Sequence, residues 1–113
     1  MNIQIYGVSK SADTRKAERY FKERRIKFQS VDLKKYAMSG REFESVLRAV
    51  GGIEHLVDWE GKSPDLDLLR YLAEDRDKED KVFENQLLMR LPVVRNGSKA
   101  TVGYAPEVWE SWE

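Results

Sequence analysis

A strand, a helix and a second strand follow one another within the first 33 residues, and this order constrains the fold more than any other feature. Residues 3–6 and 28–33 are rich in apolar side chains, and a helix is expected between them over about residues 12–25. Three residues form the inner face of this helix: Ala17, Tyr20 and Phe21. A β-α-β unit of this length makes the two strands parallel, with a right-handed crossover. The chain is therefore predicted to be an α/β protein.

The middle of the chain is predicted to be helical. Ser39 and Glu42 match a capping box, in which the serine oxygen accepts from the amide three residues on and the glutamate reaches back. Apolar residues at helical spacing follow, and two glycines then stop the helix. These residues are Phe43, Val46, Leu47, Val50, Gly51 and Gly52.

Two further helices are expected before the sheet resumes. Ser63 places a capping hydroxyl before Pro64 at the first helical position. The second of these helices is expected over about residues 77–88. The first is expected to turn Leu66, Leu69 and Leu72 inward, and the second carries the apolar residues Val82, Phe83 and Leu87.

The end of the chain returns to strands. Residues 92–95 and 99–104 flank Asn96-Gly97, a dipeptide suited to a hairpin turn, so these strands are expected to be antiparallel. A last helix opens after Ala105-Pro106, with three side chains available to cover the sheet: Val108, Trp109 and Trp112. The order β-α-β, helices, β-β-α predicts a four-stranded mixed sheet with a helical insertion at about residues 38–90.

The sequence contains no cysteine among its 113 residues. Disulfides, cysteine-based zinc sites and every thiol mechanism are therefore excluded. No segment approaches the ~20 apolar residues that span a membrane, and the start, Met1-Asn2-Ile3, lacks the pattern of a secretory signal. The lone His55 is expected to be solvated or packed. We expect one cytoplasmic domain, residues 1–113, with no membrane association, metal or other cofactor.

Charge is unevenly distributed along the chain. Residues 1–36 hold ten Lys or Arg against four Asp or Glu, whereas residues 37–113 hold ten against sixteen. The basic part is either a solvated helix face or a surface for an acidic partner or an anion. The formal net charge is zero, which is unlike a dedicated nucleic-acid-binding protein, so no direct nucleic-acid binding is expected.

Several segments together resemble one known family. The match rests on Ile5-Tyr6-Gly7 through Arg15-Lys16-Ala17, on the helical middle, on Asn85-Gln86-Leu87-Leu88-Met89-Arg90-Leu91-Pro92-Val93-Val94, and on Val102-Gly103-Tyr104-Ala105-Pro106-Glu107. The last two segments look like NPLL-x-x-RP-V-V and VGF-x-P-E of the arsenate-reductase-like (ArsC) family. That family belongs to the thioredoxin superfamily and includes the Spx-type transcription regulators. The resemblance implies a thioredoxin-like fold over nearly the whole chain.

The residues that would carry the family's chemistry are replaced. The resemblance implies a cysteine thiolate at the position of Ser11, and many thioredoxin-like proteins have a second cysteine at that of Thr14. A serine hydroxyl ionises too weakly without an adjacent base and cannot exchange a disulfide. Leu91 and Ala105 stand where the resemblance implies oxyanion-binding arginines, and residues 58–60 stand where another basic residue is expected. These degenerate active-site positions predict that the chain does not reduce arsenate.

A weak anion or glutathione site could remain at the start of the first helix, where amides are unpaired. The candidates for ligand or anion binding are Lys10, Ser11, Arg15 and Pro92. The alternative is that Ser11 or Ser9 only caps the helix, which contributes about 1 kcal/mol. The resemblance also implies a cis peptide bond before Pro92, which would present the backbone of Leu91 to an extended peptide or a thiol ligand.

Two functions remain open. The first is a non-catalytic, redox-inactive binding or regulatory module with a protein partner, by analogy with Spx-type relatives in the transcription machinery. Trp59, between two acidic residues, is the aromatic best suited to such a contact, because Trp109 and Trp112 are expected to cover the sheet. The alternative is a thiol- or glutathione-dependent oxidoreductase or transferase related to arsenate reductase. In that function, Ser11 or Thr14 would donate a hydrogen bond to a bound thiolate.

Overall fold

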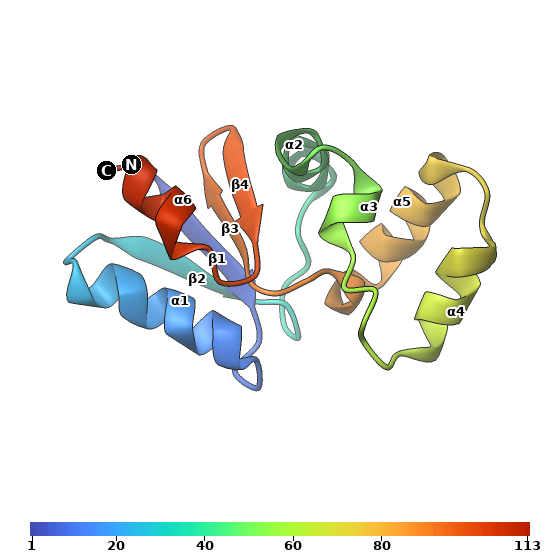
Figure 1. Cartoon of the computed structure of the whole chain (residues 1–113), viewed down its shortest axis with the longest axis horizontal. Coiled ribbons are helices and arrows are strands. Elements are labelled where there is room, and N and C mark those ends of the chain that lie inside the picture. The colour runs from blue at the N-terminus through green and yellow to red at the C-terminus, as the bar shows by residue number, and fades with distance from the viewer.

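The computed structural model describes all residues, 1–113, and contains one four-stranded sheet (Figure 1). The strands β1 (Ile3–Gly7), β2 (Phe28–Asp32), β3 (Val93–Asn96) and β4 (Lys99–Val102) lie in the order β2-β1-β3-β4. β1 and β2 are parallel, whereas β3 runs antiparallel to both β1 and β4. The predicted α/β fold with a mixed sheet is confirmed.

Alternating side chains of the central strands divide the hydrophobic core into two clusters, one on each face of the sheet. One face is covered by α1 (Ala12–Glu23) and α6 (Pro106–Ser111). The seven buried residues of this first cluster are Ile3, Ile5, Ala17, Tyr20, Phe21, Val94 and Trp109. The inner face predicted for the first helix is therefore confirmed.

Trp109 anchors α6 in this first cluster. Its side chain is fully buried, and its ring centroid lies 5.2 Å from those of both Tyr20 and Phe21. Trp112 is partly buried against the same cluster, as predicted. Val108 is exposed, so the prediction that it covers the sheet is wrong. A helix of six residues turns only one narrow stripe toward the sheet, and Trp109 fills that stripe.

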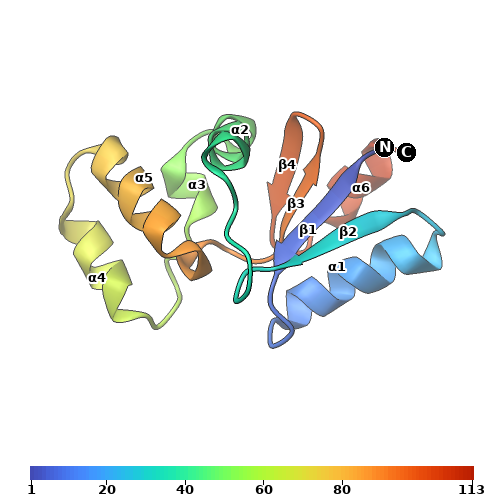
Figure 2. The same cartoon turned by 180° about the vertical axis from the view of Figure 1, so that it is seen from behind.

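The segment between β2 and β3 forms the predicted helical insertion, which lies beside the sheet (Figure 2). Its helices are α2 (Gly40–Val50), α3 (Ile53–Leu56), α4 (Pro64–Tyr71) and α5 (Asp75–Glu84), followed by the 3-10 turn η1 (Gln86–Leu88). It buries a second cluster of thirteen residues against the other face of the sheet: Tyr6, Met38, Phe43, Val46, Ile53, Leu56, Val57, Leu66, Leu69, Val82, Leu88, Met89 and Val93. None of the helices is long and apolar enough to cross a membrane.

The start and stop signals of the insertion act as predicted. Ser39 Oγ accepts from the Glu42 amide at 3.2 Å, and the Glu42 carboxylate accepts from the Ser39 amide at 2.8 Å. Gly51 ends α2 with φ 90°, in the left-handed region that favours glycine. Ser63 Oγ accepts from the Asp65 amide at 3.3 Å and caps α4.

The helix predicted over residues 77–88 starts earlier and ends sooner. Asn85 leaves the helical conformation, with φ −130° and ψ 82°. The next turn places Gln86 inside, where its amide group accepts from the Met38 N–H at 2.6 Å and donates to the Met38 carbonyl at 3.0 Å. Of the apolar residues in this segment, Val82 is fully buried, whereas Phe83 and Leu87 are 39% and 48% exposed.

The C-terminal hairpin differs from the prediction at its turn and at the end of its second strand, which was predicted to reach residue 104 but ends at Val102. Asn96 pairs with Lys99, so the loop is Gly97-Ser98 rather than Asn96-Gly97. Gly97 has φ 63°, which suits a two-residue turn with glycine in its first loop position. The Leu91-Pro92 peptide bond is cis, as the resemblance implied.

A polar network fastens the insertion to the sheet. Tyr6 donates its hydroxyl hydrogen to the Glu42 carboxylate, and the Arg95 guanidinium lies 3.5 Å from the same oxygen and donates to Gln4 at 2.9 Å. Burial, together with the hydrogen bond to Glu42, raises the pKa of Tyr6 to about 12. Burial would raise the pKa of Glu42, but hydrogen bonds from Tyr6 and Ser39 outweigh it and lower that pKa. Because Glu42 also caps α2, the network ties the start of the insertion to β1 and β3.

Candidate functional site

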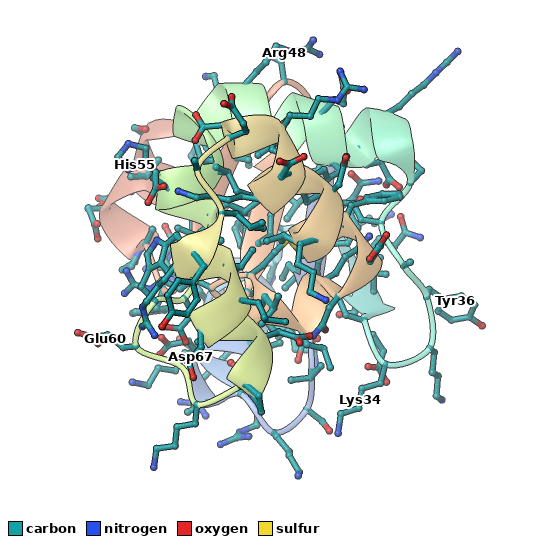
Figure 3. All side chains as sticks on the ribbon, turned by 90° about the vertical axis from the view of Figure 1, so that its right-hand side faces the viewer. Lys34, Tyr36, Arg48, His55, Glu60 and Asp67 are labelled. Atoms are coloured by element: carbon teal, nitrogen blue, oxygen red, sulfur yellow. The ribbon has the colours of Figure 1, made fainter.

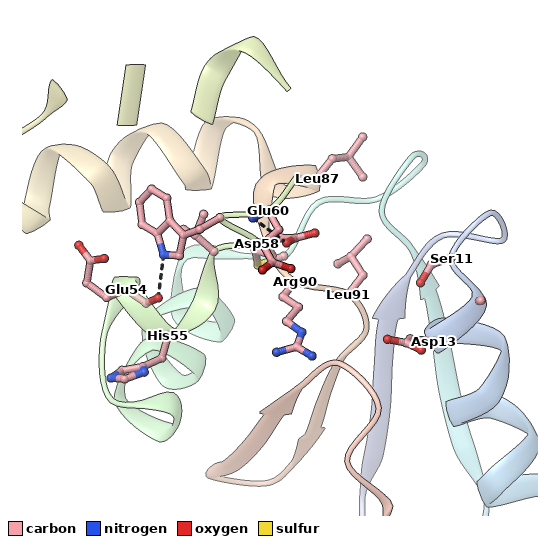
Figure 4. A pocket seen from close by; sticks show the side chains of 13 residues that line it. Ser11, Asp13, Glu54, His55, Asp58, Glu60, Leu87, Arg90 and Leu91 are labelled. Atoms are coloured by element: carbon pink, nitrogen blue, oxygen red, sulfur yellow. Dashed lines mark hydrogen bonds between the residues drawn. The ribbon is translucent and has the colours of Figure 1, made fainter. Parts of the chain in front are cut away.

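A cleft of about 840 Å³ lies between the start of α1 and the insertion (Figure 4). Ser11 and Asp13 lie on one side of it, and His55 and Glu60 lie on the other. Its lining consists of Ser11, Ala12, Asp13, Glu54, His55, Val57, Asp58, Trp59, Glu60, Leu87, Met89, Arg90 and Leu91. The fold therefore brings together three of the predicted site features: Ser11, Leu91 and the segment 58–60.

Ser11 is the N-cap of α1. Its backbone is extended, and its Oγ accepts from the Thr14 amide at 3.1 Å, which satisfies one of the unpaired donors of the helix start. Ser9 does not have this role, because it contributes only its carbonyl, which accepts from the Arg15 guanidinium at 2.5 Å. The capping role predicted for Ser11 is therefore present, and its hydroxyl hydrogen remains available for donation.

Thr14 is turned away from the cleft. It is 5% exposed and packs against Gly7, where a Cβ would come within 2.4 Å of Thr14 Oγ1. Its hydroxyl has no hydrogen-bond partner and lines a separate cavity of about 140 Å³ near Ser30. Ser11 and Thr14 therefore do not face one common ligand space.

Most of the other candidate residues do not line the cleft. Lys10 and Arg15 are exposed outside the cleft, and Pro92 is buried and does not line the cleft. Ala105 occupies the N-cap position of α6 without a side-chain hydrogen bond, and it packs against the cluster that contains Trp109. Of the four residues predicted to bind a ligand or an anion, only Ser11 lies in the cleft.

The charge around the cleft is mainly negative. Asp13, Asp58 and Glu60 form no ion pair, whereas Glu54 is paired with Lys78 at 2.7 Å. The hydrogen bond to Glu54 raises the pKa of Lys78. Carboxylates at this density repel an oxyanion such as arsenate or phosphate.

Arg90 is the only guanidinium in the lining, and it was not among the site residues predicted from the sequence. It precedes Leu91, the position at which the family pattern has an arginine. Its amide donates to the Leu56 carbonyl at 2.8 Å, and its guanidinium covers Gly103, where a Cβ would lie 2.9 Å from Arg90 Nε. Gly103 has φ 70°, so two separate constraints favour glycine there. A basic residue next to the expected position was the signal that could have identified Arg90.

Trp59 forms part of the cleft wall. Its Nε1 donates to the Glu54 carbonyl at 2.9 Å, its own carbonyl accepts from Arg70 at 2.7 Å, and its ring packs against the second cluster. His55 is exposed at the surface of the insertion, as predicted for a solvated side chain (Figure 3). No group of three His, Asp or Glu side chains is arranged to hold a metal ion.

Solved structures with this fold include proteins described as arsenate reductases. An arsenate reductase from Vibrio cholerae matches with a TM-score of 0.83 at 18% identity, over 98% of this chain and 97% of that chain. An ArsC family related protein from Bacteroides fragilis matches with a TM-score of 0.85 at 17% identity, over 100% and 98%. An arsenate reductase related protein from Brucella melitensis matches with a TM-score of 0.66 at 22% identity, over 99% and 94%.

No protein-family model matches the chain, and no curated protein sequence matches it. The likeness at these identities is one of fold, and it extends over the whole chain. The resemblance drawn from the sequence is confirmed at this level. The chain has the thioredoxin-like fold of the ArsC-related proteins, and it has that fold without any cysteine.

Proposed function

We propose that this chain is a redox-inactive binding module that acts in the cytoplasm through a protein partner. The observation that carries the proposal is the charge of the cleft beside Ser11, where three carboxylates without ion pairs face one guanidinium. A charge-assisted contact to an oxyanion is worth roughly 1.5–3 kcal/mol. A carboxylate at the same position makes the interaction with the oxyanion repulsive. The cleft is therefore poorly suited to arsenate.

The position of the nucleophile supports the same proposal. Ser11 Oγ is engaged in capping α1, and it forms no hydrogen bond to a side chain that could act as its base. A hydroxyl in this setting has no route to a nucleophilic alkoxide near neutral pH and cannot form a disulfide. By analogy with Spx-type relatives, the transcription machinery is the first class of partner to examine.

Activity assays and a ligand titration test the proposal. We expect no arsenate reduction and no disulfide reduction above the blank, with either glutathione or thioredoxin as the reductant. In amide-resolved NMR, phosphate, arsenate and glutathione should cause no saturable shifts in residues 9–16 and 91–94. Turnover in either assay would overturn the proposal.

One observation favours the alternative, a glutathione-dependent enzyme. Ser11 lines the cleft, and its hydroxyl hydrogen is free to be donated to a bound thiolate. Thr14 cannot share this role because it faces a different cavity. If this alternative holds, glutathione at sub-millimolar concentration shifts the amides of residues 9–16 saturably, and Ser11→Ala weakens that binding.

A further inference from the structure

We propose that the cleft beside Ser11 binds an extended basic segment of a partner protein, one in which lysine or arginine alternates with apolar side chains. This inference rests on the proposed function and names the chemistry of the partner. The cleft volume of about 840 Å³ lies near the upper end of the range for ligand pockets, roughly 300–1,000 Å³. It is much larger than a single cation needs.

The charge complementarity lies on the insertion side of the cleft. Asp58 and Glu60 belong to the loop after α3, make no ion pair, and face the space between that loop and α1 (Figure 4). Asp58 Oδ1 accepts from the Glu60 amide at 3.2 Å, which holds the two residues together. Asp13 adds a third carboxylate from the opposite side, although the N-terminus of α1 already stabilises its charge.

The floor of the cleft gives a reason for apolar side chains in the partner. Val57 and Met89 are buried beneath it, whereas Leu87 is 48% exposed and Leu91 is partly exposed. An apolar floor under an acidic rim matches a segment with both kinds of side chain. The aliphatic stems of lysine and arginine can cover apolar surface while their charged ends reach the rim.

A free segment fits this cleft better than a second copy of the chain. The chain's own basic residues gather on α1 and the turn after it, and α1 is a helix held against the sheet by its buried face. A packed helix cannot extend into a neighbour's cleft. Figure 3 shows that Lys34 and Tyr36 also lie on the opposite side of the molecule from Glu60.

Fluorescence anisotropy with the full chain tests the proposal. The probe is a fluorescein-labelled peptide of about eight residues in which leucine alternates with lysine and arginine, at about 50 mM salt. We expect saturable binding that weakens at about 500 mM salt. Spermidine and a peptide with glutamate in place of the basic residues should compete much more weakly. No saturable binding, or equal competition by spermidine, would overturn the proposal.

A matched pair of double variants tests whether the peptide binds in the cleft. Asp58→Asn with Glu60→Gln removes two charges from the cleft, and asparagine keeps an oxygen for the hydrogen bond to residue 60. Asp77→Asn with Glu84→Gln removes the same charge from exposed positions on α5. We expect the first pair to weaken binding about tenfold and the second less than about twofold. Equal losses would indicate non-specific attraction and would refute the assignment to the cleft.

The same samples separate this proposal from the proposed function. Arsenate reduction by any of them would overturn the binding module itself, whatever the peptide does. Absence of peptide binding together with absence of turnover would refute only the proposal that the partner segment is basic, and the proposed binding module would stand. Peptide-induced amide shifts should fall on residues 11–13, 58–60 and 87–91, and shifts confined to α5 would also contradict the proposal.

Discussion

Replacing Ser11 with alanine tests whether this hydroxyl stabilises the start of α1. The change removes the hydrogen bond of 3.1 Å to the Thr14 amide and keeps the Cβ, so no cavity forms. Loss of an N-cap serine costs about 1 kcal/mol, within a range of roughly 0.5–2. Because α1 buries Tyr20 and Phe21 against the sheet, this cost enters the free energy of global unfolding. The expected fall in Tm is about 4 °C.

Urea unfolding, followed by circular dichroism, measures this cost. Ser11→Asp should stay within about 0.5 kcal/mol of the parent chain, because aspartate is an equally good N-cap and its charge suits a helix N-terminus. Ser9→Ala should also change stability by less than about 0.5 kcal/mol, because Ser9 contributes only its carbonyl. A parent-like Ser11→Ala, or an equal loss in Ser9→Ala, would refute the assignment of the cap.

Three further perturbations probe the sheet and the core. Gly7→Ala places a Cβ about 2.4 Å from Thr14 Oγ1, and we expect urea unfolding to show a loss of about 1–3 kcal/mol that Thr14→Ala in the same chain partly restores. The pKa of Tyr6 is raised from its ordinary value of 10.0 to about 12 in the folded chain, so the folded state keeps a proton that the unfolded state loses. Stability should therefore fall as the pH rises from about 10 to about 12, and Tyr6→Phe should remove that fall in a pH series of urea unfolding curves. Trp109→Phe removes a hydrogen bond of 2.8 Å to Thr101 and part of a fully buried ring, and calorimetry should record a loss of about 3 kcal/mol.

Elements specified by local rules could be predicted from the sequence. The capping box of Ser39 and Glu42 uses atoms three residues apart, so no distant part of the chain is needed to recognise it. The buried face of α1 follows from helical spacing in the same way. The cis bond before Pro92 could not be read from local rules and was expected only from the family resemblance.

The wrong end predicted for α5 arises where a distant partner determines the outcome. Gln86 is buried because it bonds to Met38, 48 positions away, and this bond turns Leu87 outward. The acidic rim of the cleft also could not be predicted from the sequence. Asp13 and Glu60 are far apart in the sequence and line one cleft only because of how the insertion packs. Local patterns contain no information about either contact.

The two chain ends lie together at the end of the sheet away from the insertion (Figures 1 and 2). Asn2 donates to Asn96, and Tyr20 donates to the carboxylate of Glu113. The central β1–β3 ladder pairs Gln4 with Arg95, which lies 91 positions away in the sequence, so forming the sheet requires closure of a very long loop. A circular permutant with joined ends, opened in the exposed connection at residues 73–74, would make this pairing local and lower the contact order. Its sheet would then form from one continuous stretch of chain, and it should refold faster than the parent at similar stability.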